Sequence, residues 1–351
     1  MLGVRSIMGA SAAAAVGVVS VATVAKTVEE KFPAPKFSLQ AERFDLSTMQ
    51  GRFAKQLTNC DPSLLLAREQ EIRAAEGLLR DFSEGKAANA SNSQLWSARK
   101  LVEATVQPDT KEIIPRPFRM SGYVPFNGPV CVAMMASQST PALLFWNWVN
   151  QSQNALVNYF NRNASSPTSN ETLFISYSAA VGAALTMAFG LSQFISRRYS
   201  PARAAQLMKF VAFPSSVVAS CSNCYIMRRP EIESGISILD KDGNTLADGA
   251  RSSVAANKAV METVLSRGIL QIPVFFIPPL LMSIPPFSAA SAAVAIPLTT
   301  MFTIASFGFG LPSTVAIFPQ VGSVKVEELE PELREAVGSQ PDGTVYYNKG
   351  L

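Results

Sequence analysis

The sequence predicts an all-α fold of the polytopic membrane class. We expect about five transmembrane helices, with broken spans that contain Pro and Gly, plus a soluble helical N-terminal region. Only 16% of the 351 residues are charged and 48% are apolar, whereas soluble domains average about 25% charged residues. The missing charges leave uncharged runs at 120–161, 172–196, 210–227 and 268–324. Because about 20 apolar residues span a bilayer core, each run is long enough, or nearly so, to hold a membrane span.

Composition also excludes several functions. The 30 basic and 26 acidic residues leave a net charge of +4 without a basic stripe, so we expect no nucleic-acid partner. The four cysteines do not form the pattern of a disulfide framework. The chain has no histidine, which removes most acid–base catalysis, His-paired nucleophiles and most zinc sites. We therefore expect no enzymatic activity, no cofactor and no metal.

Residues 1–28 contain Arg5 and Lys26, no acidic residue and a run of small apolar residues. This composition is typical of a mitochondrial transit segment, but it also suits a secretory signal or a weak Ala-rich helix that is retained. These three interpretations remain open.

Residues 29–118 are charged and interrupted by prolines, so we expect them to form a soluble helical region. An amphipathic helix is predicted over 62–82, with Asp61 as its N-cap. A second helix is predicted over 91–106, and the motif QPDT (107–110) ends it.

Residues 119–324 form the predicted membrane bundle. Its first segment, Gly122–Pro129, contains Pro and Gly and is expected to be a broken helix. The amide-rich helix over 140–163 follows. Further spans are expected at 173–195, 209–227, 268–284 and 292–318. A polar insertion (228–267) is predicted to hold a hairpin that turns at Asp242–Gly243, and 325–351 form a C-terminal tail.

One face of the helix over 140–163 carries a stripe of amides. On a helix they fall within an arc of about 100°: Asn147, Asn150, Gln151, Asn154, Asn158 and Asn161. Burying one unpaired amide in hydrocarbon costs roughly 2–7 kcal/mol, so the stripe needs a polar surface to face. It could line a cavity for an amino-acid zwitterion, pair with amides of partner helices, or lie at the lipid headgroups. The aromatic opposite face and uncharged flanks argue against the headgroup layer.

Three further residues are candidates for a substrate pathway. Asn127 lies in the broken segment, where freed carbonyls and half-helix ends could contact a substrate; the alternative is a packing kink. Asp109, close to the start of the membrane part, could attract an ammonium group or cap a helix. Asn223, in the span over 209–227, could likewise contact a substrate or serve only in packing.

Several motifs occur in order along the chain: FDLSTMQGRFAKQL (44–57), PDT (108–110), RMSGYVPFNG (119–128), TPALLFWNWVNQSQNALVNYFNR (140–162), NCYIMRRPEIESGI (223–236), VLSRGILQIPVFFIPP (264–279), AIFPQ (316–320) and YYNKGL (346–351). By these motifs the sequence resembles the sideroflexins from about residue 41 to its last residue. The resemblance implies a multi-pass carrier of the inner mitochondrial membrane with about five spans. It also implies transport of serine, and of other small neutral amino acids such as alanine and cysteine, into the matrix for one-carbon metabolism.

The sequence departs from the family pattern at two places. Gln107 stands where the family has His before Pro-Asp-Thr, so a proton-coupled step through that His is impossible in this chain. Residues 1–28 are longer and more presequence-like than the family pattern, which leaves the import route open.

The leading hypothesis is thus a carrier with the lipid bilayer and serine as its partners. It would work by alternating access around a polar pocket lined by Asn147, Asn150, Asn154 and Asn158. The alternatives are a non-transporting membrane scaffold or assembly factor, in which the amides pair with partner helices, and a carrier linked to iron homeostasis.

Overall fold

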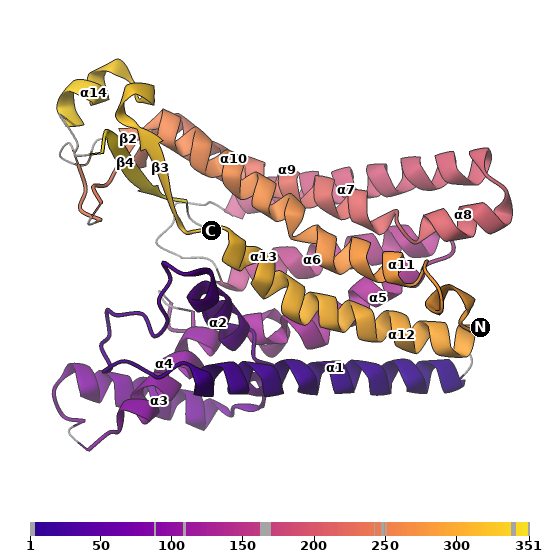
Figure 1. Cartoon of the computed structure of the whole chain (residues 1–351), viewed down its shortest axis with the longest axis horizontal. Helices are drawn as coiled ribbons and strands as arrows, with labels where there is room; N and C mark the ends of the chain where they lie inside the picture. The colour runs from indigo at the N-terminus through magenta and orange to yellow at the C-terminus, as the bar shows by residue number, and fades with distance from the viewer. Residues whose placement is uncertain are drawn as a thin grey trace.

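The computed structural model describes residues 4–87, 89–107, 110–161, 170–241, 243–246, 249, 251–337 and 342–349. Helices dominate these residues, and the longest ones run side by side along the long axis of the molecule (Figure 1). The strands described form two small two-stranded antiparallel sheets. These observations confirm the predicted all-α class.

Five helical stretches among the described residues are long and apolar enough to cross a membrane: Met8–Lys31, Asn170–Arg198, Pro201–Ser234, Ser253–Leu281 and Ala293–Ile317. The predicted number of spans is confirmed, although one of the five helices is not the one that we expected. The amide-rich helix is not among the five, because its polar residues make it less apolar. The N-terminal helix α1 takes its place.

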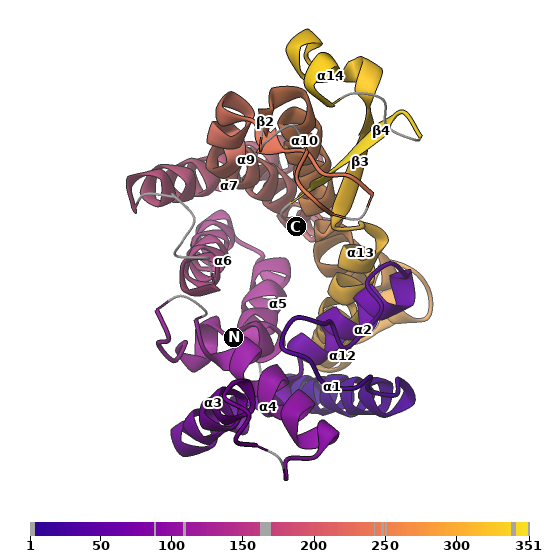
Figure 2. The same cartoon turned by 90° about the vertical axis from the view of Figure 1, so that its left-hand side faces the viewer.

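The bundle consists of ten helices in the described residues. They are α1 (Val4–Lys31), α5 (Gly128–Ala136), α6 (Thr140–Asn161), α7 (Asn170–Arg198), α8 (Pro201–Met208), α9 (Ala212–Ser234), α10 (Ser253–Ile269), α11 (Ile277–Leu281), α12 (Ala292–Ala305) and α13 (Leu311–Ile317). Viewed end-on, α1, α12, α13, α10, α9, α7, α6 and α5 follow one another around the molecule (Figure 2). Neighbours in this order pack together, with the turn 306–310 joining α12 to α13, and the contact between α5 and α12 closes the ring from α12 to α5.

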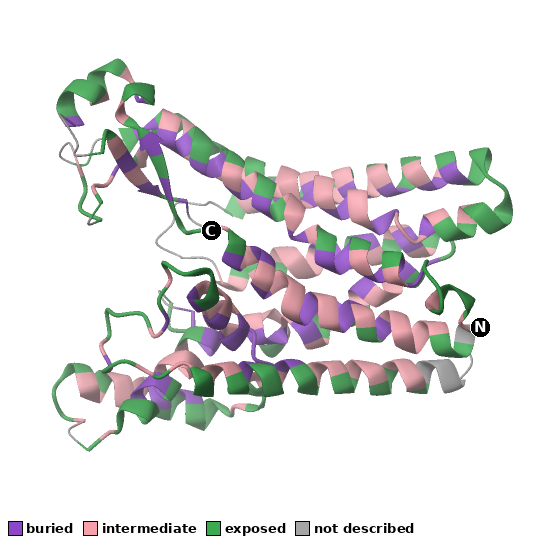
Figure 3. Cartoon of the chain, viewed as in Figure 1, coloured by how far each residue is buried: buried purple, intermediate pink, exposed green. Residues whose placement is uncertain are grey.

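Burial follows the helical repeat along the spans (Figure 3). On α7 the buried positions recur mostly every four residues and are small: Ser176, Ala180, Ala184, Ala188 and Ser192, followed by Ile195. Large apolar side chains of the same helix, such as Phe174 and Phe194, are exposed. Large apolar side chains that point away from the bundle suit a lipid-facing surface, and small residues suit the contact between helices.

The predicted breaks in the spans are present as three π-helical turns among the described residues: Tyr123–Asn127, Ile272–Phe276 and Ser306–Gly310. Each contains or adjoins Pro or Gly, which cannot continue a regular helix unstrained. The turns meet inside the bundle. The Tyr123 and Phe307 rings stack at 3.9 Å between centroids, and a Cβ added to Gly310 would lie 2.3 Å from Cβ of Pro273.

The N-terminal region contains α2 (Met49–Asn59), α3 (Glu69–Ser83) and α4 (Asn92–Thr105). Ser91 and Gln94 form a capping box that starts α4, close to the predicted boundary. The helix predicted over 62–82 is wrong in one respect, because the chain forms a 3₁₀ turn at Pro62–Leu66 before α3 begins. Glu71 accepts a hydrogen bond from the backbone N–H of Arg68 at 2.7 Å, which starts a new helix there.

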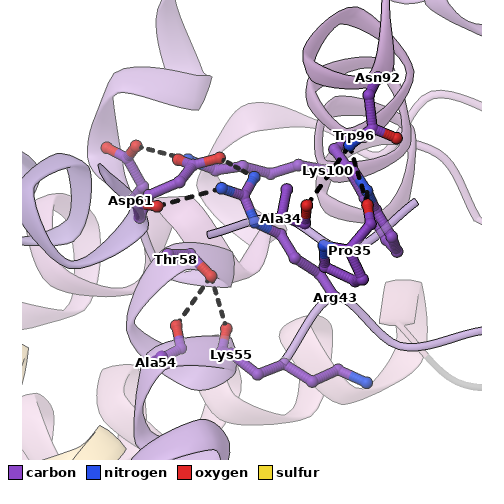
Figure 4. A network of polar contacts seen from close by, with 11 residues as sticks. Ala34, Pro35, Arg43, Ala54, Lys55, Thr58, Asp61, Asn92, Trp96 and Lys100 are labelled. Carbon is purple, nitrogen blue, oxygen red and sulfur yellow. Dashed lines mark hydrogen bonds and ion pairs between the residues drawn. The ribbon is translucent and has the colours of Figure 1, made fainter. Parts of the chain in front are cut away.

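A network of charges ties α1 to this region (Figure 4). Lys100 of α4 lies 2.8 Å from the carboxylate of Glu29 on α1 and 3.1 Å from that of Asp61. Arg43 also contacts Glu29. Residues distant in sequence thus hold the end of α1 against α2 and α4.

The polar insertion and the C-terminal tail fold together. Strands β1 (Ile236–Ser237) and β2 (Arg251–Ser252) pair, as do β3 (Val321–Lys325) and β4 (Thr344–Asn348), with Val324 opposite Val345. A buried cluster joins them to α10 through Ile238, Ala259, Val345 and Tyr347. The tail also contains the helix α14 (Pro331–Val337).

The predicted hairpin turn is partly visible. Leu239 and Thr245 form an antiparallel bridge, and the backbone N–H of Asp240 donates to the carbonyl of Asn244 at 2.9 Å. Gly243 adopts φ +88°, a value that favours glycine. Asp242, the other predicted turn residue, lies outside the described residues.

Candidate functional site

Helix α6 begins after Ser139, whose hydroxyl accepts a hydrogen bond from the backbone N–H of Ala142 at 3.4 Å. Its amides show a gradient of burial along the helix. Asn147, Asn150 and Gln151 are buried, Asn154 is half-buried and Asn158 is exposed. The stripe therefore faces the interior of the bundle in its first half and opens outward in its second half.

The buried half of the stripe faces α5 and the π-helical turn before it. The Nδ2 group of Asn127 donates to Oδ1 of Asn154 at 3.3 Å. One turn later on α5 and one turn earlier on α6, Sγ of Cys131 lies 3.9 Å from Oδ1 of Asn150. The structure thus brings together Asn127, Asn150 and Asn154, which sequence reasoning had proposed separately for the broken segment and the stripe.

Two carboxamide oxygens in this region have no hydrogen-bond partner although they are buried. They are Oδ1 of Asn127 and Oδ1 of Asn147. The Nδ2 group of Asn147 donates to the carbonyl of Leu143 within its own helix, at 2.9 Å, which leaves its oxygen free to accept. Each unsatisfied buried acceptor costs about 1–3 kcal/mol. The region can therefore accept hydrogen bonds from a polar solute that carries donors.

Other polar groups of α6 anchor the helix. Asn161 donates to the carbonyl of Phe118 at 2.7 Å, and Gln153 donates to the carbonyl of Pro117 at 2.7 Å. The rings of Phe118 and Phe160 stack at 5.0 Å between centroids. These contacts fix α6 to the segment that leads into the bundle, so the amides at positions 153 and 161 have structural partners.

The remaining predicted site residues are not brought to this cluster by any described contact. Asn223 is half-buried on α9. Asp109 lies outside the described residues. Gln107 is buried, and its side-chain oxygen accepts a hydrogen bond from the backbone N–H of Thr110, so it holds a turn.

Sequence reasoning did not single out Arg119, Ser121 or Ser216. All three are buried, and each has a polar side-chain atom without a partner. For Arg119 a signal was available, because a basic residue at the start of an uncharged run is a candidate for burial. For the two serines only the tertiary structure reveals the unpaired hydroxyls.

Two cavities stand out among the described residues, and neither is lined by the amides of α6. A cavity of about 30 Å³ lies within the charged network of the N-terminal region. A groove of about 470 Å³ runs along α7, next to Gly182, Thr186 and Gly190. In the described part of the chain, no group of three or more His, Cys, Asp and Glu residues is placed to hold a metal ion.

Comparisons with known proteins give a consistent result. A family model described as "Sideroflexins" matches residues 38–351. Human Sideroflexin-5 is 38% identical over 325 residues, which cover 91% of this chain and 94% of that protein. Human Sideroflexin-1 is 33% identical over 328 residues, which cover 90% and 98%. A sideroflexin of Dictyostelium discoideum is 32% identical over 328 residues, with 90% and 98% covered. No solved structure matches the chain.

Proposed function

Because this chain belongs to the sideroflexin family, we propose that it is a carrier, not an enzyme, that moves serine across the inner mitochondrial membrane into the matrix. Other small neutral amino acids, such as alanine and cysteine, are the expected further substrates. Delivery of serine to the matrix supports one-carbon metabolism.

The observation that carries this proposal is the pair of buried acceptors without partners, Oδ1 of Asn127 and Oδ1 of Asn147. A serine zwitterion brings an ammonium group with three donors and a hydroxyl with one more. Carboxamide oxygens accept these hydrogen bonds without a fixed charge. A cluster of neutral amides therefore suits the donors of such a solute.

The π-helical turns support transport by alternating access. π-helical turns occur frequently at functional sites, and broken helices at membrane depth persist where they are buried in protein or line a polar cavity. The turn Tyr123–Asn127 carries Asn127 itself and stacks on the turn Ser306–Gly310 through Tyr123 and Phe307. Movement at these turns would separate α5 from α6 and open the amide cluster, which is closed in this structure.

A scaffold role is the second candidate. The hydrogen bond between Asn127 and Asn154 favours it, because amide pairs between helices also hold bundles together. A carrier linked to iron finds less support, since the described residues contain no group of three or more His, Cys, Asp and Glu residues that could hold a metal ion.

Uptake of labelled serine into liposomes that contain the purified full chain tests the proposal, with Asn147→Leu as the key variant. Its only hydrogen bond is to its own helix, and its oxygen is buried and unpaired. Replacing an unsatisfied buried acceptor by an apolar side chain of similar size removes its desolvation cost, so the change can be nearly neutral or stabilising. We expect this variant to melt at the wild-type temperature or above it, and to lose serine uptake by about tenfold or more, equivalent to about 1.4 kcal/mol.

The matched control is Gln138→Leu, which removes an exposed amide from the loop between α5 and α6. It should transport serine like the wild type. Folded wild-type protein that takes up no small amino acid would favour the scaffold instead. Normal uptake by Asn147→Leu would show that Asn147 and its amide cluster do not bind the substrate during transport.

A further inference from the structure

Among the described residues, Arg119 is a buried cation without a counter-charge. Its side chain is 4% exposed, and it is the residue before the 3₁₀ turn Met120–Gly122 that leads into the bundle. Its Nε group donates to the backbone carbonyl of Ile114 at 2.7 Å. Its Nη1 group is buried and has no acceptor.

Arg52 is half-buried and also has no carboxylate in an ion pair, but its guanidinium donates to the backbone carbonyls of Ala316, Leu46 and Ser47. Five other described cations, with side chains at most 17% exposed, are paired. Each forms an ion pair with a carboxylate: Arg43 with Glu29, Arg99 with Glu103, Lys100 with Glu29 and Asp61, Arg228 with Glu231, and Lys349 with Glu262. Arg119 has no such partner among the described carboxylates. A buried charge without a partner is strongly destabilising, so this position suits an anion that the described residues do not supply.

The shape of the guanidinium indicates which anions it can bind. Its planar N–H groups match a carboxylate or a phosphate, which accept two parallel hydrogen bonds. The turn Pro62–Leu66 packs against Met120–Gly122, so the position lies between the N-terminal region and the bundle. Burial at 4% exposure favours a small anion over a lipid headgroup, whose phosphate stays at the bilayer surface.

Two further buried polar groups without partners follow Arg119 along the same segment. Ser121 is fully buried, and its hydroxyl has no partner. Asn127, at the end of the π-helical turn, offers an unpaired oxygen. Polar groups without partners thus continue from Arg119 toward the amide cluster.

We propose that Arg119 binds the α-carboxylate of the amino acid that this carrier transports. The proposal rests on the proposed function and deepens it, because it assigns the recognition of the carboxylate to a residue outside the amide stripe. Recognition of the carboxylate at Arg119 and contact with the amides of α6 are then successive steps of the pathway.

Melting of the purified full chain in detergent tests the anion site without transport. Sodium propionate, a carboxylate without an amine, should raise the melting temperature of the wild type above that in sodium chloride of equal ionic strength. Arg119→Gln keeps a donor for the carbonyl of Ile114 but removes the charge, and it should lose the propionate effect. Arg116→Gln is the matched control, since Arg116 is exposed on the neighbouring turn, and it should keep the effect.

Inorganic phosphate is the second probe in the same measurement. Stabilisation by phosphate and not by propionate, lost in Arg119→Gln, would assign the site to a phosphate group and overturn the carboxylate proposal. A propionate effect that persists in Arg119→Gln would also overturn it.

Serine uptake then separates this proposal from the proposed function. We expect the KM for serine to rise by about tenfold or more in Arg119→Gln, with a smaller change in kcat, and to rise less in Arg119→Lys, which keeps the charge. An unchanged KM in Arg119→Gln contradicts the role of Arg119 while leaving the carrier function intact. A wild type that responds to propionate but takes up no serine contradicts the carrier function while leaving the anion site intact.

Discussion

Asn147 and Asn161 are the same residue type on the same face of α6, but they have different surroundings. Asn161 donates to the carbonyls of Phe118 and Val157, at 2.7 and 2.8 Å. Asn147 reaches only a carbonyl of its own helix, and its oxygen remains buried and unpaired. The surroundings of an amide in this bundle therefore determine what it can bind. Asn161 anchors α6, whereas Asn147 can accept a hydrogen bond from a solute.

Glu330 connects the C-terminal tail to the start of α10. Its carboxylate accepts hydrogen bonds from the backbone N–H groups of Ser253 and Val254, at 2.7 and 3.0 Å, and from the hydroxyl of Ser252 at 2.9 Å. Burial opposes ionisation of this group, but these hydrogen bonds, together with its own backbone, hold the pKa of Glu330 below its ordinary value. A carboxylate at a helix N-terminus also interacts favourably with the helix dipole.

Replacing Glu330 by Gln should therefore lower stability in a pH-dependent way. The folded-state pKa lies below the unfolded value of about 4.3, so the carboxylate stabilises the folded protein above that value and this contribution is lost as the pH falls through the folded pKa. We expect the variant to lose about 1 kcal/mol at pH 7, and the difference from the wild type to shrink below about pH 4. Melting in detergent at several pH values measures it.

Glu332→Gln is the control, since Glu332 is exposed in the first turn of α14. An equal loss of stability in both variants would mean that net charge, and not the contact with α10, causes the effect.

At the scale of elements, α1 packs against α12 and the π-helical turn after it through glycines. A Cβ added to Gly17 would lie 2.4 Å from the fully buried Ile304, and one added to Gly308 would lie 2.3 Å from Val21. Such close approach of two helices is possible only where side chains are absent. In this structure α1 is thus a fitted member of the bundle.

Gly17→Val should consequently destabilise the full chain by about 1–3 kcal/mol, the usual effect of overpacking a filled interface. Gly182→Val is the matched control on α7, because nothing lies within 4 Å of a Cβ added there. Comparing the melting temperatures of the two variants measures the difference. Identical melting of both variants would argue that α1 does not pack in the mature protein.

At the scale of the whole molecule, the charged network connects the N-terminal region to the bundle. Lys100 is the central residue, because it pairs with Glu29 on α1 and with the buried Asp61 before the 3₁₀ turn. That turn packs against Met120–Gly122. The orientation of the N-terminal region over the proposed anion site therefore depends on this network.

Lys100→Met should destabilise the protein strongly, since it leaves Asp61 buried without its cation. Breaking a buried ion pair costs about 3 kcal/mol or more. Lys86→Met is the control, because Lys86 pairs with Glu84 at an exposed position, where such pairs contribute about 0–1 kcal/mol. Thermal melting and limited proteolysis of the N-terminal region measure both. A wild-type melting temperature for Lys100→Met would show that the network contributes little.

The sequence by itself determined the helical class, the uncharged runs, the position of the amides on one face of α6 and the breaks in the spans. These features are local, because a helix repeats every 3.6 residues and Pro or Gly interrupts it wherever it stands. The family motifs were equally readable, since they are contiguous segments.

The tertiary structure alone decided which polar atoms are buried without partners, that α1 joins the bundle, and that Arg119 has no carboxylate partner among the described residues. Each of these depends on segments far apart in sequence, such as α1 with α12 or the turn Pro62–Leu66 with Met120–Gly122. Whether a polar atom is buried or paired depends on two surfaces in contact. The sequence of one segment describes only one of these surfaces.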